Sequence, residues 1–481
     1  MTVLSSYIAG DWRPGGNVGT DLNPARPREV VAEVHQADPQ TASDAVEAAR
    51  DAFPAWRALP APARGDILRK AADQLEQRAD TIGTDLTREE GKTLAEGIGE
   101  TRRAAAILRY YAGQTLEPDG ETFPSASPRT FLYARREPVG VVVVISPWNF
   151  PIAIPAWKIA PALAYGNTVV FKPAELVPLT AVRLVEALQD AGLPAGVLNL
   201  VLGRSAVIGG MLTNHPGVDA ITFTGSNTVG RAIQLQATTR GAKVQLELGG
   251  KNPAVVLADA DLSLAAEQVA RAAFLSAGQK CTATSRVIVE TPILQSFSDR
   301  LVSLATSWRL GDPLAADTRI GPLVSEERLQ TVMGYLKDGG GGGRFLCGGT
   351  RAEELGEGYF IRPTVVSEVD PNLRLARDEI FGPVAVLLPV SSYEDAIALA
   401  NDTPFGLSAS VFTRDLGKAM RFAQDIQAGV VKINQESAGI EFQAPFGGTK
   451  GSSSGQREQG KAAREFFTQW KTVYMDPPVS A

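Results

Sequence analysis

Between Val141 and Leu248 the chain alternates short runs of β-branched apolar residues with amphipathic segments. The apolar runs cover residues 141–145, 168–171, 197–202, 220–223 and 244–248. Helices are predicted between them, near residues 179–190 and 229–237, with a short one before residue 220. Unbroken apolar runs of this length are typical of strands buried on both faces of a parallel sheet. The sequence therefore predicts an open α/β sheet, in which ligands bind beyond the carboxyl ends of the strands.

The flanking regions extend this pattern. Apolar residues at helical spacing begin at Thr41 and return in residues 66–77 and 96–111. Pro54, Pro60 and Pro62 are expected to separate the first helical run from the second. A second α/β region is predicted from Gly249 to about Asn434, with strands in residues 254–257, 286–290, 364–366 and 384–389. Residues 339–343 are consecutive glycines, which predict a mobile surface loop, and residues 466–474 alternate like a strand.

Charge and residue usage exclude several classes of protein. The chain has 47 Lys and Arg against 53 Asp and Glu, a net charge of −6, and no basic block, so a nucleic-acid partner is not expected. Its 2 cysteines and 2 histidines exclude a disulfide scaffold and a metal centre built on these residues. Residues 138–157 carry no charge but contain four prolines, so we predict a buried strand followed by a turn and no membrane span. With no secretory signal at the N-terminus, a soluble cytoplasmic protein is expected.

Cys281 is a candidate nucleophile between a helix of small residues and a strand, although a free cysteine is more often an inert buried residue. Cys347, beside two glycines, is expected to be inert. A Cys–His pair of the thiol protease type is not expected, because His215 looks like a turn residue and His35 ends an early strand. Any base that activates Cys281 is therefore of another residue type.

Glu247 and Asn149 are the next candidates. Glu247 ends an apolar strand, and Gly249 and Gly250 follow after Leu248. A carboxylate there is either a general base at the ligand-binding edge or a solvated terminal charge. Asn149 lies in a proline-rich turn, where its amide either donates to an oxyanion or satisfies the turn itself.

Two strand ends have the composition of a nucleotide site. Residues 223–230 join a strand to a helix through Gly225 and Ser226, so a helix N-terminus could meet a phosphate there. Lys172 and Glu175 close another strand and could hold ribose hydroxyls.

Together these segments resemble the aldehyde dehydrogenase superfamily, in its non-phosphorylating branch, over essentially the whole chain. The resemblance rests on residues 147–151, 166–175, 223–226, 247–251, 278–281, 379–383 and 445–448, which follow one another in the order of the family's motifs.

The resemblance implies roles for the candidates. Cys281 is the nucleophile, Glu247 the general base and Asn149 an oxyanion donor beside the Cys281 backbone N–H, while Glu458 matches a carboxylate that some members use in proton relay. No metal is implied. The resemblance also implies which residues contact the cofactor: Lys172 and Glu175 at the adenosine ribose, Gly225 and Ser226 at the pyrophosphate, and Glu379 at the nicotinamide ribose. The full implied set is Ile145, Ser146, Pro147, Trp148, Lys172, Ala174, Glu175, Phe223, Thr224, Gly225, Ser226, Val229, Leu248, Gly249, Glu379 and Phe381.

The implied fold is α/β, with a Rossmann-like cofactor domain, an α/β catalytic domain and a β-strand oligomerisation arm. The cofactor domain is expected in residues 1–121 and 142–248, with a return in 435–455, and the catalytic domain in 249–434. The arm is expected in 122–141 and 456–481, where it extends a neighbour's sheet and implies a homodimer or homotetramer.

The implied reaction is oxidation of an aldehyde to a carboxylate through a thiohemiacetal and a thioester on Cys281. Glu175 favours NAD as the cofactor, with NADP also accepted. Residues 280–286 and 451–468 are similar to 2-oxoglutarate-semialdehyde (2,5-dioxopentanoate) dehydrogenases. Trp157 stands where bacterial succinate-semialdehyde dehydrogenases carry an arginine, which weakens a succinate-semialdehyde assignment. The sequence also leaves open a broad-specificity dehydrogenase, a non-catalytic binding protein and a cofactor-independent thioesterase.

Overall fold

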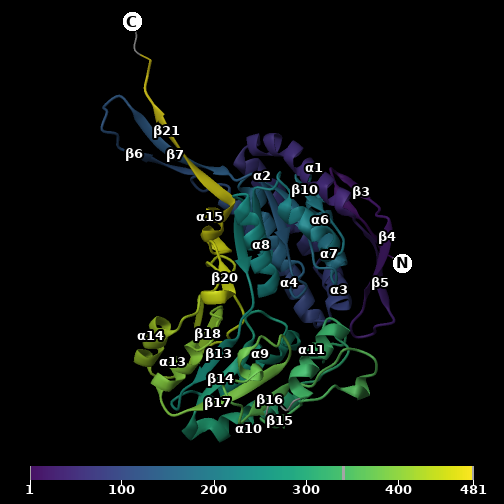
Figure 1. Cartoon of the computed structure of the whole chain (residues 1–481), viewed down its shortest axis with the longest axis vertical. Coiled ribbons are helices and arrows are strands. Elements are labelled where there is room, and N and C mark those ends of the chain that lie inside the picture. Colours follow the sequence, from purple (N-terminus) through teal and green to yellow (C-terminus); the bar gives the residue numbers. More distant parts are fainter. Residues whose placement is uncertain (1, 338–341, 479–481) are drawn as a thin grey trace.

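The computed structural model describes residues 2–337 and 342–478 (Figure 1). In its upper half lies an eight-stranded sheet with strand order β20-β12-β11-β8-β9-β10-β2-β3. The five strands from β12 to β10 are mutually parallel, as predicted, and antiparallel strands close both edges. The strands are β2 (Ser6–Ile8), β3 (Asp11–Arg13), β8 (Val141–Ile145), β9 (Thr168–Lys172), β10 (Leu198–Leu200), β11 (Ala220–Thr224), β12 (Lys243–Glu247) and β20 (Ser453–Ser454).

Helices cover both faces of this sheet. Successive side chains of a strand point to opposite sides, so an all-apolar strand packs into a core on each face. On β8, Val142 and Val144 pack into the core formed with α2 to α6, whereas Val141 and Val143 pack into the core formed with α1, α7 and α8. The helices are α1 (Pro39–Ala58), α2 (Ala61–Gln77), α3 (Ala79–Glu90), α4 (Leu94–Gln114), α5 (Ala153–Ala164), α6 (Pro178–Asp190), α7 (Ser205–Asn214) and α8 (Asn227–Thr239). Since both faces are covered, the strand ends are where a ligand can reach the sheet.

A second sheet occupies the lower half of Figure 1, with strand order β15-β16-β17-β14-β13-β18-β19. It is parallel except for β15. Its strands are β13 (Asn252–Val256), β14 (Thr284–Glu290), β15 (Arg344–Cys347), β16 (Thr364–Ser367), β17 (Val384–Val390), β18 (Ser408–Phe412) and β19 (Val430–Ile433). The helices of this half are α9 (Leu262–Phe274), α10 (Leu294–Ser307), α11 (Glu326–Lys337), α12 (Arg374–Arg377), α13 (Tyr393–Asn401) and α14 (Leu416–Asp425).

Two small sheets complete the fold. The strands β21 (Thr468–Met475), β7 (Phe131–Pro138) and β6 (Gly120–Phe123) form an antiparallel sheet that projects from the upper half, after the short helix α15 (Ala463–Phe467) (Figure 1). The strands β1 (Thr2–Leu4), β5 (Val30–Gln36) and β4 (Asn17–Leu22) form the other. The projecting sheet contains part of each segment predicted to form an arm, and the domain boundaries themselves stay a prediction.

The segment of residues 138–157 was expected to be a strand and a turn, and this is wrong for its last part, where α5 begins at Ala153. Pro155 is the third residue of α5, where a backbone N–H has no acceptor within the helix, so the proline costs no hydrogen bond. The backbone N–H groups of Ile152 and Ala153 both donate to Glu100 Oε1, at 3.1 Å each. A residue 52 positions upstream thus stabilises the start of this helix.

Two further expectations need correction. Pro54 lies inside α1 rather than ending it, and α3 forms where no helix was predicted. Part of the glycine run 339–343 lies outside the described residues. None of the helices in the described part of the chain is long and apolar enough to cross a membrane.

Candidate active site

Cys281 follows a strained turn that leads from α9 into β14. This 3₁₀ turn (Leu275–Gly278) has left-handed backbone at Ser276 (φ +54°) and Ala277 (φ +51°), which non-glycine residues rarely adopt. Asn252 Nδ2 donates to the Cys281 carbonyl at 2.8 Å and fixes the loop after the turn. Strain of this kind is retained where the surrounding structure holds a functional residue in place.

The Cys281 side chain borders a cavity of about 320 Å³. Burial, together with the charges of the Glu379 and Glu247 carboxylates, raises the pKa of its thiol to about 12. A thiol with this pKa is ionised to only about one part in 10⁵ at neutral pH. Cys281 therefore needs a nearby acceptor for its proton before it can attack a substrate.

Glu247 is the last residue of β12 and is almost fully buried. Its Oε2 accepts a hydrogen bond from Ser453 Oγ at 2.7 Å, and its Oε1 has no hydrogen-bond partner among the described residues. Burial raises the pKa of Glu247 well above its ordinary value, and the charge of Glu458 adds to the shift. Gly447 (φ +146°) makes room for Oε1, since a Cβ there would lie 2.8 Å from that oxygen. The buried, half-satisfied carboxylate has the properties of a general base.

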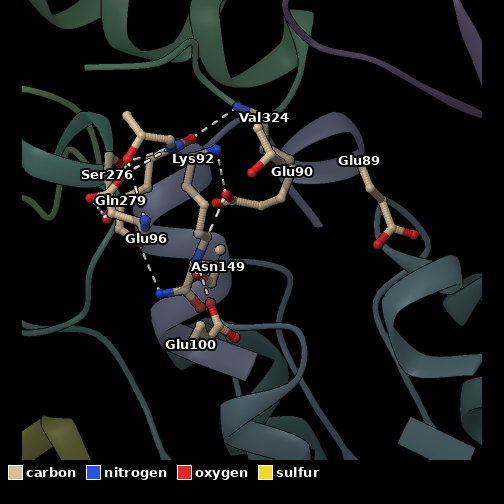
Figure 2. Close-up of polar contacts among 12 residues, drawn as sticks. Glu89, Glu90, Lys92, Glu96, Glu100, Asn149, Ser276, Gln279 and Val324 are labelled. Atoms are coloured by element: carbon tan, nitrogen blue, oxygen red, sulfur yellow. Dashed lines mark hydrogen bonds and ion pairs between the residues drawn. The ribbon is translucent and has the colours of Figure 1, made fainter. Parts of the chain in front are cut away.

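Asn149 is held from two sides (Figure 2). Its Nδ2 donates to the Gln279 carbonyl at 3.0 Å, and its own carbonyl accepts from Lys92 Nζ at 2.7 Å. Lys92 is fully buried, and its ammonium forms an ion pair with Glu100 at 2.6 Å and lies 4.4 Å from the centre of the Phe150 ring. Because Glu100 also caps α5, one buried ion pair fixes both the Asn149 turn and the helix that follows it.

The residues expected to hold a cofactor gather at the carboxyl ends of the parallel strands. Ile145, Lys172, Thr224 and Glu247 are the last residues of β8, β9, β11 and β12. Phe223 lies in β11, and Val229 lies in the first turn of α8. The other candidates from these strand ends lie in the adjoining turns: Ser146, Pro147, Trp148, Ala174, Glu175, Gly225, Ser226, Leu248 and Gly249.

Several of these groups have the surplus hydrogen-bonding capacity that a polar ligand would use. The hydroxyls of Ser146 and Thr224 are buried without a partner among the described residues. Burial lowers the pKa of Lys172 to about 8, and within the described part of the chain its ammonium donates only to the neighbouring Pro173 carbonyl, at 2.9 Å. Ser226 caps α8, so the free N–H groups of that helix face the same edge. These residues fit a dinucleotide.

Glu379 and Phe381 approach this edge from the second sheet. Glu379 Oε1 accepts from the Gly250 backbone N–H at 2.9 Å, and burial raises its pKa to about 7. The Phe381 ring meets the Trp148 ring edge to face, with centroids 5.3 Å apart. A Cβ at Gly249 would lie 2.2 Å from Glu379 Oε2, so a larger residue there would displace the Glu379 carboxylate. The structure thus brings the candidates from both halves of the chain together.

The comparison with protein families agrees with this geometry. The model described as the aldehyde dehydrogenase family matches residues 12–473. The chain belongs to the aldehyde dehydrogenase family. It is accordingly an NAD(P)-dependent enzyme that oxidises aldehydes, as the sequence predicts.

Individual relatives of this aldehyde dehydrogenase extend over its full length. The alpha-ketoglutaric semialdehyde dehydrogenase of Bacillus subtilis is 48% identical, with 98% of each chain covered. The alpha-ketoglutarate semialdehyde dehydrogenase of Haloferax volcanii is 44% identical, again with 98% of each covered. Among solved structures, betaine aldehyde dehydrogenase of Staphylococcus aureus in complex with NAD+ has a TM-score of 0.95 and 35% identity, covering 99% of this chain and 95% of that one. These likenesses confirm the predicted fold and cofactor class.

Glu458 is more constrained than a free proton carrier. Its carboxylate forms a buried ion pair with Lys158, accepts from Trp157 Nε1 at 2.8 Å, and accepts from Thr222 Oγ1 at 3.3 Å. Its charge still acts on Glu247 and raises the pKa of that group.

The remaining reactive residues lie away from the cavity. Cys347 ends β15, with its Sγ 3.7 Å from the Pro363 carbonyl, and His215 accepts from the Gly217 N–H in the turn after α7. No group of three or more His, Cys, Asp or Glu side chains in the described ranges could hold a metal ion. The sequence did not single out Lys92 or Glu100, whose role depends on contacts across 57 and 52 positions with no local motif.

Proposed function

We propose that this enzyme oxidises 2-oxoglutarate semialdehyde to 2-oxoglutarate, with Cys281 as nucleophile, Glu247 as general base and Asn149 as oxyanion donor. The observation that carries the catalytic roles is the placement of the two groups: Cys281 borders the cavity after a strained turn, and Glu247 Oε1 is buried without a hydrogen-bond partner among the described residues. The substrate is proposed because the Bacillus subtilis and Haloferax volcanii relatives carry that activity in their names, at 48% and 44% identity.

The first step is attack of the Cys281 thiolate on the aldehyde carbon. The thiol proton leaves through a water molecule to Glu247 or, where that carboxylate is absent, to solvent. The carbonyl π electrons move onto oxygen and give a thiohemiacetal oxyanion. Asn149 Nδ2 carries two hydrogens and gives one to the Gln279 carbonyl, which leaves the second for the oxyanion. The Cys281 backbone N–H is the proposed second donor, and loss of one such donor typically costs about 10²–10³ in rate.

NAD(P)+, when bound, supplies the acceptor for the hydride whose loss converts the thiohemiacetal into a thioester. The residues proposed to hold it are the set at the strand ends, with Lys172 and Glu175 at the adenosine ribose, Gly225 and Ser226 at the pyrophosphate, and Glu379 at the nicotinamide ribose. The Glu175 carboxylate would repel a 2′-phosphate, so we propose a preference for NAD with NADP still accepted.

The last step is hydrolysis of the thioester. Glu247 Oε1 has no hydrogen-bond partner among the described residues. With any proton from the first step released to solvent, it accepts a proton from a water molecule that attacks the carbonyl carbon. The carbon–sulfur bond breaks, the carboxylate leaves, and Cys281 is free for another turnover.

Cofactor reduction across a panel of aldehydes tests this proposal. The panel holds 2-oxoglutarate semialdehyde, succinate semialdehyde, an aliphatic aldehyde, an aromatic aldehyde and betaine aldehyde, each with NAD and with NADP. We expect kcat/KM for the oxo-acid semialdehyde to exceed the others by at least about tenfold, or 1.4 kcal/mol. A flat profile would establish a broad-specificity enzyme, and a maximum at succinate semialdehyde would establish a succinate-semialdehyde dehydrogenase. If the protein only hydrolysed esters and needed no cofactor, it would be a thioesterase. If it turned over none of these substrates, it would be a binding protein.

We also propose an assembly through the arm, which combines residues 122–141 and 456–481. Both β21, at the edge of the projecting sheet, and β19, at the edge of the seven-stranded sheet, have one side without a strand partner in the described ranges. Pairing of β21 with a neighbour's β19 gives a homodimer, and two dimers give a homotetramer. Light scattering is expected to show a dimer or tetramer for the full chain. After deletion of residues 468–481, the same measurement is expected to show a monomer. An unchanged mass after this deletion would refute the arm.

The proposed domains are those expected from the sequence: a cofactor domain in residues 1–121, 142–248 and 435–455, and a catalytic domain in 249–434. The cytoplasmic location stays a prediction.

A further inference from the structure

The cavity beside Cys281 contains three basic side chains, Lys92, Arg103 and Lys280. The semialdehyde proposed above carries a carboxylate at the end opposite its aldehyde. An enzyme that distinguishes this substrate from a neutral aldehyde needs a cationic group in the cavity whose charge is not already used.

Of the two lysines, Lys92 has its charge paired and Lys280 is bound to a backbone carbonyl. Lys92 is paired with Glu100 at 2.6 Å and donates to the Asn149 carbonyl at 2.7 Å. Lys280 donates to the Arg271 carbonyl at 3.0 Å, and burial lowers its pKa while the charges of Glu436 and Glu96 act in the opposite direction. Lys92 therefore has no charge left for a new anion. Lys280 forms no ion pair among the described residues, but its compact ammonium lacks the planar fork that binds both oxygens of a carboxylate.

The acidic groups of the cavity are engaged as well. Glu96 closes the capping box at Thr93 and accepts from Ser276 Oγ at 2.8 Å. Glu100 holds Lys92 and the start of α5, and Glu436 faces Lys280. These contacts leave no carboxylate of the cavity committed to Arg103.

Arg103 differs from both lysines. Its guanidinium has five N–H donors, and its one hydrogen bond within the described ranges is from Nη2 to the Ile440 carbonyl. It forms no ion pair among the described residues, and burial lowers its pKa, with Glu441 and Glu100 offsetting only part of the effect. A partly buried guanidinium with several free donors is suited to bidentate recognition of a carboxylate.

Two side chains strengthen the case. Trp157 lies in the same cavity without a charge and uses its indole N–H on Glu458, so it offers no alternative anchor. Arg102, the neighbour of Arg103 on α4, is exposed and lies near Glu76 and Asp80 outside the cavity. It provides a matched control.

We propose that Arg103 binds the substrate's carboxylate and determines specificity for aldehydes that carry an acid group at the far end. This inference rests on the proposed function, because it presupposes a carboxylate-bearing substrate that reacts at Cys281.

The test compares Arg103→Gln, Arg103→Lys and Arg102→Gln on two substrates, 2-oxoglutarate semialdehyde and hexanal. With Arg103→Gln we expect kcat/KM for the semialdehyde to fall about 10²-fold, or about 2.7 kcal/mol, and that for hexanal to change less than about threefold. Arg103→Lys, which keeps the charge but loses the bidentate fork, should lie between wild type and Arg103→Gln. Arg102→Gln should match wild type on both substrates. Inhibition by 2-oxoglutarate gives a readout without turnover, and its inhibition constant should rise in parallel.

The outcomes separate the two proposals. If wild type shows no preference for the semialdehyde over hexanal, the proposed function fails. If wild type has the preference and Arg103→Gln keeps it, this inference fails. An equal loss on both substrates in Arg103→Gln and Arg103→Lys, with normal thermal stability, would assign Arg103 a structural role and also overturn it.

Discussion

Replacing Cys281 by alanine is expected to lower kcat for aldehyde oxidation by at least about 10⁴-fold while leaving NAD+ binding intact. Without the sulfur no thiohemiacetal forms, and direct loss of hydride from an aldehyde would leave an acylium ion. Apart from Glu379 and Phe381, the residues proposed to bind the cofactor lie at the strand ends of the eight-stranded sheet, so NAD+ binding should not depend on this side chain. Steady-state cofactor reduction and titration of NAD+ by protein fluorescence measure the two effects separately.

Cys347→Ala is the matched control, because Cys347 is the other cysteine of the chain and does not line the cavity. It should retain wild-type kcat. Oxidation that survives in Cys281→Ala, or an equal loss in Cys347→Ala, would contradict the nucleophile assignment.

The parallel sheets could be predicted because their strands are continuous apolar runs, which need no knowledge of distant residues. The run at residues 141–145 became β8 with the bounds expected, and Glu247 ends β12 as its place before two glycines suggested. The helix α5 could not be predicted in the same way. Its prolines argue against a helix, and its first N–H groups are satisfied by Glu100 in another helix.

The candidate site was predictable in its residue types and not in its electrostatics. The motifs named Cys281 and Asn149, but they carry no sign of the buried Lys92–Glu100 pair behind Asn149. The two partners are near each other in sequence, but their contacts with the Asn149 carbonyl and the start of α5 form only when α4 and the turn before α5 meet in three dimensions. The proposed role of Arg103 could not be predicted from the sequence either. No motif surrounds this residue, and the proposal depends on which neighbouring charges are already paired in the structure.

Replacing Glu247 by glutamine is expected to leave acylation of Cys281 in place and slow hydrolysis of the thioester by about 10²–10⁴-fold. The amide has the same shape and retains the bond from Ser453 but cannot take a proton from water. Rapid mixing should then show a burst of about one reduced cofactor per active site followed by slow turnover, and mass spectrometry should find the acyl group on Cys281. The exposed Glu267→Gln is the control and should show wild-type turnover. A variant whose main defect is weak NAD+ binding, with no burst, would contradict the general-base assignment.

The pH dependence supplies an independent check on the same residue. The base acts only as a carboxylate, and burial together with the charge of Glu458 raises the pKa of Glu247 well above its ordinary value. Hydrolysis by wild type should therefore increase with pH through that raised pKa, at higher pH than an exposed glutamate would give, and then level off. In Glu247→Gln this increase should be absent, because the group that titrates is gone. If the rate of hydrolysis in the variant still increased with pH at the same midpoint, another group would be titrating, and Glu247 would not be the general base.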